Sequence, residues 1–430
     1  MYQKRKISIA ISLMLVTLLS TSIFAAEKIT VWTWYDGVLG QVFKQLVKDD
    51  FEAKTGIIVD LVTVPVADMN NKLLLSVLGG DAPDVVELYS NQIVELGVRG
   101  ALENLKDKPN LNKTLEQMHP GLMRQLTYKS AVFALPGEAN WTWTYYRKDI
   151  LAEVGAEVPK TWDELTALST KLKARKMDIY YDYQGDAATR STGRLLPFVF
   201  QKGTDIYSAD GSKSNLDDPE VIKAFKEFVS LFKDYKLPLE DPGYQTFVDG
   251  STPIQIYQNW YYSLFERSAP QLAGKWDLAE MPGTKRKDGT IDRTNTGKML
   301  TWAMTASSKK KDAAWKFMQW AVSPEFTGKF SKLTYETPEK WRLFFSTKDA
   351  IEKSPFPDAQ KDVARKALAN CVMQRAIVGG YVADRYVDFA FNSVVLQNAN
   401  PEDAIKKAAK DSTTEIQRKL KEFNRMISKL

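Results

Sequence analysis

Short apolar segments alternate with amphipathic segments near the start of the chain, and this alternation constrains the fold more than any other feature. The predicted strands occupy residues 29–36, 57–64 and 83–89. The predicted helices occupy residues 38–53 and 67–80. A strand–helix–strand–helix–strand order predicts a parallel sheet with right-handed crossovers. Ligands of such sheets bind beyond the carboxyl ends of the strands.

The remainder of the chain contains further elements of both kinds. A strand is expected at 131–135, ended by Pro136-Gly137, followed by an extended segment to about 147. Thr161 and Glu164 form a capping box at the start of a helix. Other strands are expected at 252–260 and 299–306, and other helices at 219–233, 311–322 and 401–427. A chain of 430 residues exceeds one hydrophobic core, so two lobes are expected. Because no Gly/Ser linker separates them, several chain crossings and hinge closure around a cleft are expected.

The N-terminus has the features of a targeting segment. Basic residues at positions 4–6 precede an apolar run at 7–20 and then small residues, which predicts a cleavable signal peptide at residues 1–26. The sole cysteine, Cys371, excludes an intrachain disulfide and is too far along the chain to carry a lipid anchor after the signal. The expected location is therefore the periplasm, without a lipid anchor.

Charge and residue usage exclude several functional classes. Removing the three basic residues of the signal lowers the net charge from +6 to +3, which is too weak for a nucleic-acid surface. The single histidine, His119, excludes Ser-His-Asp and Cys-His sites and a multi-histidine zinc site. No cofactor or catalytic residue is expected, and bound calcium is left open. A hydrolase using two carboxylates remains as an alternative, with Asp36, Glu138 and Asp186 near strand ends.

Aromatic residues gather where the first and third strands end. Trp32 and Trp34 share one face of their strand, with Trp32 deeper and expected in the core. Trp34 and Asp36 are expected to reach the crevice, and Tyr89 ends the third strand. Ligand clefts are typically lined by flat aromatic surface and a few fixed polar groups.

Several stretches in order resemble one family. They are "ITVWTWYDG", "FEAKTGIIVDLVTVP", "DAPDVVEL", "YYRKDIL", "VPKTWDEL", "VDGSTPIQIYQNW" and "SSKKKDAAWKFMQWAVSPE". Together they resemble the extracellular solute-binding proteins of ABC transporters, in the sugar-binding, maltose-binding-protein-like branch. The resemblance covers most of the chain after the signal.

This resemblance implies an α/β, two-lobed periplasmic binding protein fold. Each lobe would hold a mostly parallel sheet flanked by helices, with the ligand cleft between the lobes. The N-lobe would comprise residues 27–137 and 303–340, and the C-lobe residues 138–302 and 341–430. The protein would capture a sugar or oligosaccharide, act as a monomer without catalysis, and deliver the ligand to ABC permease subunits.

The family match and the strand ends together give a set of candidate ligand contacts. They are Trp34, Asp36, Tyr89, Asn91, Asn140, Trp141, Trp260 and Trp302. Trp260 matches the stacking tryptophan of the family. Paired tyrosines make ferric ion an alternative ligand. Aromatic residues near Asp36 make a polyamine another alternative.

Overall fold

The computed structural model describes residues 26–183, 190–428 and 430. The predicted signal peptide lies outside these residues, except for its last position. Within the described residues, eight strands form one sheet in the order β2-β1-β3-β12-β6-β8-β7, with β9 pairing to β6. These strands are β1 Lys28–Thr33, β2 Ile58–Thr63, β3 Val85–Tyr89, β6 Leu135–Arg147, β7 Ile179–Tyr181, β8 Ile254–Gln258, β9 Trp276–Glu280 and β12 Gly297–Met304.

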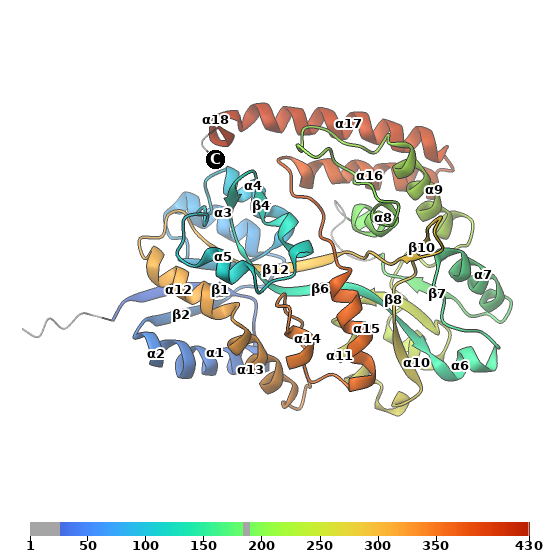
Figure 1. The fold of residues 1–430 in the computed structure, drawn as a ribbon, viewed down its shortest axis with the longest axis horizontal. Helices are drawn as coiled ribbons and strands as arrows, with labels where there is room; N and C mark the ends of the chain where they lie inside the picture. The colour runs from blue at the N-terminus through green and yellow to red at the C-terminus, as the bar shows by residue number, and fades with distance from the viewer. Residues whose placement is uncertain (1–25, 184–189, 429) are drawn as a thin grey trace, which may run out of the picture.

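The sheet has one part in each lobe, joined by two strands that run across the middle of the molecule (Figure 1). β1 lies between β2 and β3 and is parallel to both, which confirms the pairing predicted from the alternation. β12 is antiparallel to β3 and to the first half of β6. The second half of β6 is antiparallel to β8 and β9, and β7 is parallel to β8. The two-lobed α/β architecture is confirmed.

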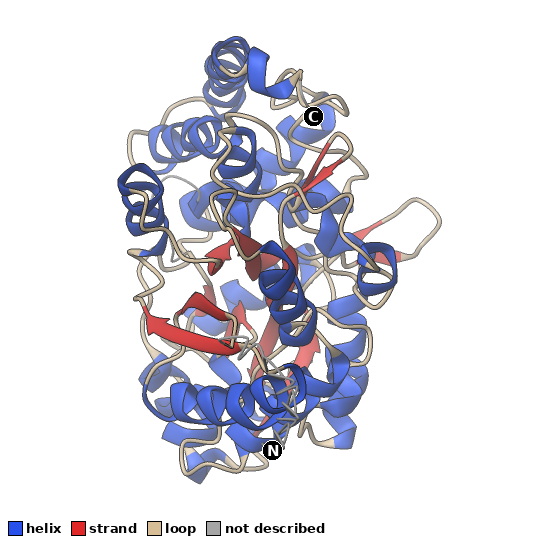
Figure 2. Cartoon of the chain, turned by 90° about the vertical axis from the view of Figure 1, so that its left-hand side faces the viewer, coloured by secondary structure: helices blue, strands red, loops and turns tan. Residues whose placement is uncertain are grey.

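Helices cover the strands on both sides, and the sheet occupies the interior (Figure 2). They are α1 Gly37–Leu46, α2 Ala53–Thr55, α3 Met69–Gly79, α4 Ile93–Val98, α5 Leu111–Leu115, α6 Lys148–Glu153, α7 Trp162–Lys173, α8 Arg190–Gln201, α9 Pro219–Lys233, α10 Tyr244–Asp249, α11 Tyr261–Ser268, α12 Lys311–Ala321, α13 Pro324–Tyr335, α14 Ala350–Lys353, α15 Asp358–Ala369, α16 Gly380–Val395, α17 Pro401–Glu422 and α18 Asn424–Ile427. A π-helical turn, Val47–Glu52, joins α1 to α2, and 3-10 turns occupy Ser90–Gln92, Pro120–Gln125 and Pro270–Leu272. Two small hairpins pair β4 Thr127–Tyr128 with β5 Ala131–Val132, and β10 Thr284–Lys285 with β11 Ile291–Asp292. None of the helices in the described ranges is long and apolar enough to cross a membrane.

Local sequence signals explain several helix ends. The Thr161 hydroxyl accepts a bond from the Glu164 amide at 3.2 Å, which confirms the predicted helix start. The helix predicted from residue 38 ends at Gly56, whose φ of 70° is the left-handed conformation that glycine adopts without strain. Aromatic packing then holds α1 and α13 together, because the rings of Phe43 and Phe330 lie 5.7 Å apart.

One strand boundary differs from the sequence prediction. β6 starts at Leu135 and continues through Pro136 and Gly137 instead of stopping there. The register of β12 against β6 shifts between Met299 and Thr301, opposite this point. Proline lacks an amide donor and glycine lacks a side chain, so both fit an irregular position in a ladder where regular strand residues do not. The result is a 13-residue strand long enough to serve both lobes.

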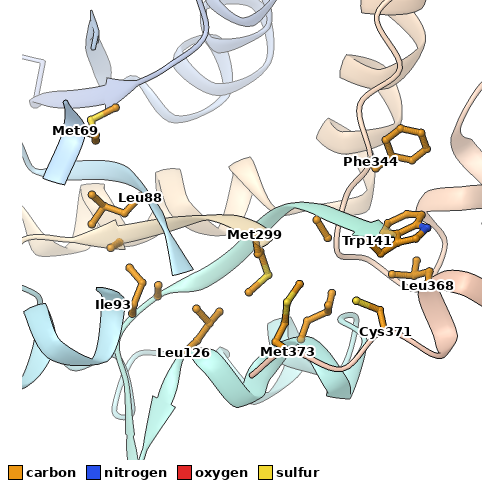
Figure 3. Close-up of a cluster of buried hydrophobic side chains, with 14 of the residues drawn as sticks. Met69, Leu88, Ile93, Leu126, Trp141, Met299, Phe344, Leu368, Cys371 and Met373 are labelled. Atoms are coloured by element: carbon orange, nitrogen blue, oxygen red, sulfur yellow. The ribbon is translucent and has the colours of Figure 1, made fainter. Parts of the chain in front are cut away.

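Buried side chains fill both lobes and the crossing between them. The aromatic cluster around Trp141, Phe344 and Leu368 lies beside the crossing strands and is continuous with the apolar group at Ile93 and Met373 (Figure 3). The crossing is therefore packed on both sides and is not a flexible linker. The residue limits of the two lobes given above stay a prediction.

Candidate functional site

A cavity of about 510 Å³ lies between the carboxyl ends of β2 and β3 on one side and helices α8 and α16 on the other. Its lining from the first side comprises Val66, Ala67, Asn70, Asn71, Tyr89, Ser90, Asn91, Gln92 and Gln125. Its lining from the second side comprises Arg190, Gly193, Arg194, Leu196, Gln374, Tyr381 and Asp384. Thr296 and the first two residues of β12, Gly297 and Lys298, complete the lining. The position agrees with the expectation that ligands bind beyond the strand ends of a parallel sheet.

A side-chain hydrogen bond fixes the turn that follows β3. β3 ends at Tyr89, and residues 90–92 form one 3-10 turn. The buried Ser90 hydroxyl donates to the Gln125 side-chain oxygen at 2.5 Å, so the turn is anchored to a neighbouring segment. Tyr89 and Asn91, two of the predicted contacts, consequently both line the cavity.

The opposite wall contains a buried polar network. The Arg194 guanidinium forms an ion pair with Asp182, and both side chains are buried. Asp384 accepts a bond from the Tyr207 hydroxyl at 2.5 Å and another from the Gln374 amide at 2.9 Å. Burial raises the pKa of Asp384 to about 7. Arg194 and Asp384 are therefore preorganised in this wall, because each already holds fixed partners.

Trp34 and Asp36 lie outside this cavity. β1 ends at Thr33, so both residues belong to the turn before α1. Asp36 is exposed and lines a separate hollow of the N-lobe beside Lys44 and Asp60. Trp34 is half-buried and packs on Tyr35, with ring centroids 4.9 Å apart. Ligand contact at Trp34 and Asp36 stays a prediction.

Trp141 and Trp302 are core residues, which corrects their place in the candidate set. Trp141 is fully buried, and its ring centroid lies 5.3 Å from that of Phe344 (Figure 3). Trp302 is 2% exposed and stacks on Phe43 at 6.0 Å. β6 and β12 are interior strands with packing on both faces, so most of their side chains, including these two tryptophans, are buried.

Asn140 and Trp260 lie at the crossing between the lobes. Asn140 is half-buried on β6 and pairs with Lys298, which lines the cavity. Trp260 follows β8 and is 42% exposed, with its ring edge-on to Tyr257 at 5.5 Å. The preceding Asn259 is buried and donates its side-chain amide to the Ala139 carbonyl at 3.0 Å, which fixes the chain that presents Trp260. Trp260 does not line the cavity, and its ligand contact stays a prediction.

Four residues that line the cavity were not predicted from the sequence as ligand contacts. Arg190, Gln374, Tyr381 and Asp384 come from or precede helices α8 and α16, neither of which was predicted. A signal for α16 was present, since Ala383, Val387, Ala390 and Val394 follow helical spacing. In α8, an internal proline at position 197 obscured the helix.

Two buried glutamates lie beneath the strand ends. The Tyr35 hydroxyl donates to Glu138 at 2.5 Å, and the Thr33 hydroxyl donates to Glu87 at 2.7 Å. Burial raises the pKa of Glu138 to about 7, while burial and the charge of Glu138 raise that of Glu87. Neither glutamate lines the cavity, so this pair is not placed to act on a ligand there.

The remaining groups named for catalysis or metal binding are separated. Asp36 lies in its own hollow, and Asp186 falls outside the described residues. Burial and the nearby Lys348 lower the pKa of His119, which does not line the cavity. Among the described residues there is no group of three or more His, Cys, Asp and Glu side chains that could hold a metal ion.

Two curated proteins similar to this chain are binding proteins. The maltotriose-binding protein of Pyrococcus abyssi is 27% identical over 69% of this chain, and the match spans 63% of that relative. The diacetylchitobiose binding protein DasA of Streptomyces coelicolor is 28% identical over 74% of this chain and 75% of its own length. Each of these relatives is described as a binding protein.

Solved structures of sugar-binding proteins share the fold of this chain. The sugar-binding protein MalE of Xanthomonas citri has a TM-score of 0.77 at 18% identity, covering 92% of this chain and 99% of its own. The cyclic alpha-maltosyl-1,6-maltose binding protein of Arthrobacter globiformis has a TM-score of 0.77 at 20% identity, covering 91% and 99%. At these identities the likeness concerns the fold. The family model described as bacterial extracellular solute-binding protein matches residues 47–339, and the chain therefore belongs to that family.

Proposed function

We propose that this protein is the substrate-binding component of an ABC importer for a sugar or oligosaccharide. The observation that carries the proposal is the cavity at the strand ends, which is lined by amide and tyrosine side chains from both lobes. Support also comes from relatives described as binding maltotriose and diacetylchitobiose. The volume of about 510 Å³ lies within the usual range of ligand sites, about 300–1,000 Å³.

The lining suits a carbohydrate chemically. Sugar hydroxyls need both donors and acceptors, and one amide side chain supplies both. Asn91 and Gln374 offer such groups from opposite walls. Tyr89 and Tyr381 offer ring surface for the apolar C–H faces of a sugar. Binding in this cavity requires no bond to be made or broken.

A ligand held from both walls favours the closed form of the two lobes, which a permease then recognises. On closure we expect Asn140, Trp260, Trp34 and Asp36 to join the contacts made by the cavity lining. The predicted signal peptide favours a periplasmic location, and the protein would meet its permease subunits there as a monomer.

Calorimetric titration against maltodextrins, chito-oligosaccharides, spermidine and ferric citrate tests the proposal. We expect at least one saccharide to bind and spermidine and iron to give no heat above dilution. Asn91→Ala should weaken that binding by about tenfold, because a hydrogen bond in a site is worth about 1 kcal/mol or more. Exposed Asn112 on α5 is outside the cavity lining, so Asn112→Ala is the matched control. Binding of spermidine or iron, with no saccharide bound, would refute the sugar proposal.

Incubation with the same oligosaccharides checks the hydrolase alternative. Chromatography should show the input oligosaccharide unchanged after extended incubation. Appearance of shorter products that the heat-inactivated protein does not release would revive a carbohydrate-active enzyme.

A further inference from the structure

Positively charged residues outnumber negatively charged ones among the described residues that line the cavity. Among the described lining residues, Arg190, Arg194 and Lys298 are cations and Asp384 is the one acid. Sugar hydroxyls do not require a cationic lining, since neutral amides serve them equally well. The charge therefore bears on which sugar the cavity accepts.

Most of these charged groups already have partners within the protein. Arg194 is paired with buried Asp182, and Asp384 accepts bonds from Tyr207 and Gln374. Lys298 also takes part in an interaction within the protein. Asp388, on the turn of α16 that follows Asp384, accepts bonds from both the amide and the hydroxyl of Ser191.

Arg190 differs from them. It begins the described part of α8, and its guanidinium lies 5.3 Å from the ring centroid of Tyr183. Its Nε atom is buried without a hydrogen-bond acceptor, and among the described residues no carboxylate lies within ion-pair distance of it. A buried donor without an acceptor is unfavourable, so a ligand that brings an acceptor to this guanidinium is favoured.

The space beside Arg190 is open to a ligand. Gly193, one turn further along α8, also lines the cavity, and no other atom lies within 4 Å of the position a Cβ would take there. A planar guanidinium forms paired bonds with a carboxylate, a geometry that an ammonium lacks.

We propose that the cavity selects an acidic oligosaccharide, one bearing a uronic acid, with its carboxylate bound by Arg190. This inference rests on the proposed sugar-binding function and narrows its substrate class. The cation–π contact with Tyr183 restricts the guanidinium, so less side-chain freedom is lost when a carboxylate binds.

The test compares acidic oligosaccharides with neutral partners of equal length by calorimetry. The pairs are trigalacturonate with its fully methyl-esterified form, trimannuronate with mannotriose, and glucuronoxylotriose with xylotriose. We expect one acidic member to bind at least about tenfold more tightly than its partner. We expect its affinity to fall when the salt concentration rises from roughly 20 to 500 mM, while a neutral sugar is unaffected.

Variants of the arginine separate its charge from its bulk. Arg190→Gln should reduce the preference for the acidic member to about twofold or less, and Arg190→Lys should retain part of it. Exposed Arg175 lies outside the cavity lining, and Arg175→Gln is the matched control. Melting curves establish that each variant is folded, and the salt series on the unaltered protein tests the charge independently of any variant.

The outcomes distinguish the two proposals. If neutral sugars bind as tightly as their acidic partners, the acidic-sugar inference fails and the sugar-binding function stands. The inference also fails if Arg190→Gln weakens both members of a pair equally. If neither member of any pair binds, and maltodextrins and chito-oligosaccharides do not bind either, the sugar-binding function itself fails.

Discussion

Replacement of Glu138 by Gln should change how the stability of the protein depends on pH. Glu138 lies on the crossing strand β6 with 6% of its surface exposed, and the Tyr35 hydroxyl donates to it at 2.5 Å. Burial raises its pKa from the ordinary value of 4.5 to about 7. A glutamine keeps the acceptor oxygen for Tyr35 but carries no ionisable proton.

The sign follows from proton binding in the two states. Because the pKa is raised on folding, the folded protein binds the Glu138 proton more tightly than the unfolded chain. The resulting stability is fully present below pH 4.5 and is lost as the pH rises through about 7. At about 1.36 kcal/mol per pH unit, the interval from 4.5 to 7 corresponds to a loss on the order of 3 kcal/mol. Ionised Glu138 also raises the pKa of Glu87, so the variant relieves that repulsion as well.

Urea unfolding followed by tryptophan fluorescence at constant ionic strength measures this loss. The free energy of unfolding of the unaltered protein should fall between pH 5 and pH 8 by on the order of 2–3 kcal/mol more than that of Glu138→Gln. Asp384 titrates in both proteins, so its contribution to the pH dependence of stability cancels when the two are compared. Exposed Glu157 provides the control, since Glu157→Gln should leave the slope unchanged. Parallel pH profiles for the unaltered protein and Glu138→Gln would refute the account of the buried pair.

Three further substitutions, and Gly193→Ala as a control, test the crossing and the aromatic residues. Gly297→Ala places a Cβ 1.7 Å from the Asn140 carbonyl oxygen, so we expect a loss of about 1–3 kcal/mol by urea unfolding, whereas Gly193→Ala enters open space and should lose nothing. An unaltered unfolding midpoint for Gly297→Ala would show that β12 can move away from β6. Trp141→Ala empties a fully buried site and should cost about 3–5 kcal/mol in the same assay, and a cost under about 1 kcal/mol would contradict its core placement. Trp260→Ala should weaken ligand binding in calorimetry while the melting temperature is retained, and unchanged affinity would remove Trp260 from the site.

The order of the elements could be predicted from the sequence because local signals and tertiary packing agree there. The apolar runs of β1, β2 and β3 are bounded by helices with clear ends such as Gly56, so their parallel pairing followed from general rules. Tyr89 and Asn91 could be placed at the cavity for the same reason, since a strand end in a parallel sheet determines where the next residues point.

The other features of the fold and the site depend on contacts between residues that are distant in the sequence. Alternation along "NWTWTYYR" gives two faces, but only the packing of Phe344 shows that the face of Trp141 is core. Pro136 reads locally as a strand end, and the register shift in the partner strand is what accommodates it. The far wall of the cavity comes from α8 and α16, whose lining residues are spread over 190–196 and 374–384 and share no local motif.

A crystal structure with the tightest-binding oligosaccharide tests the central claim most directly. The account predicts density for the sugar in the cavity, in contact with Tyr89 or Asn91 from one lobe and with α8 or α16 from the other. A sugar bound outside this cavity, or held by residues of one lobe alone, would contradict the account.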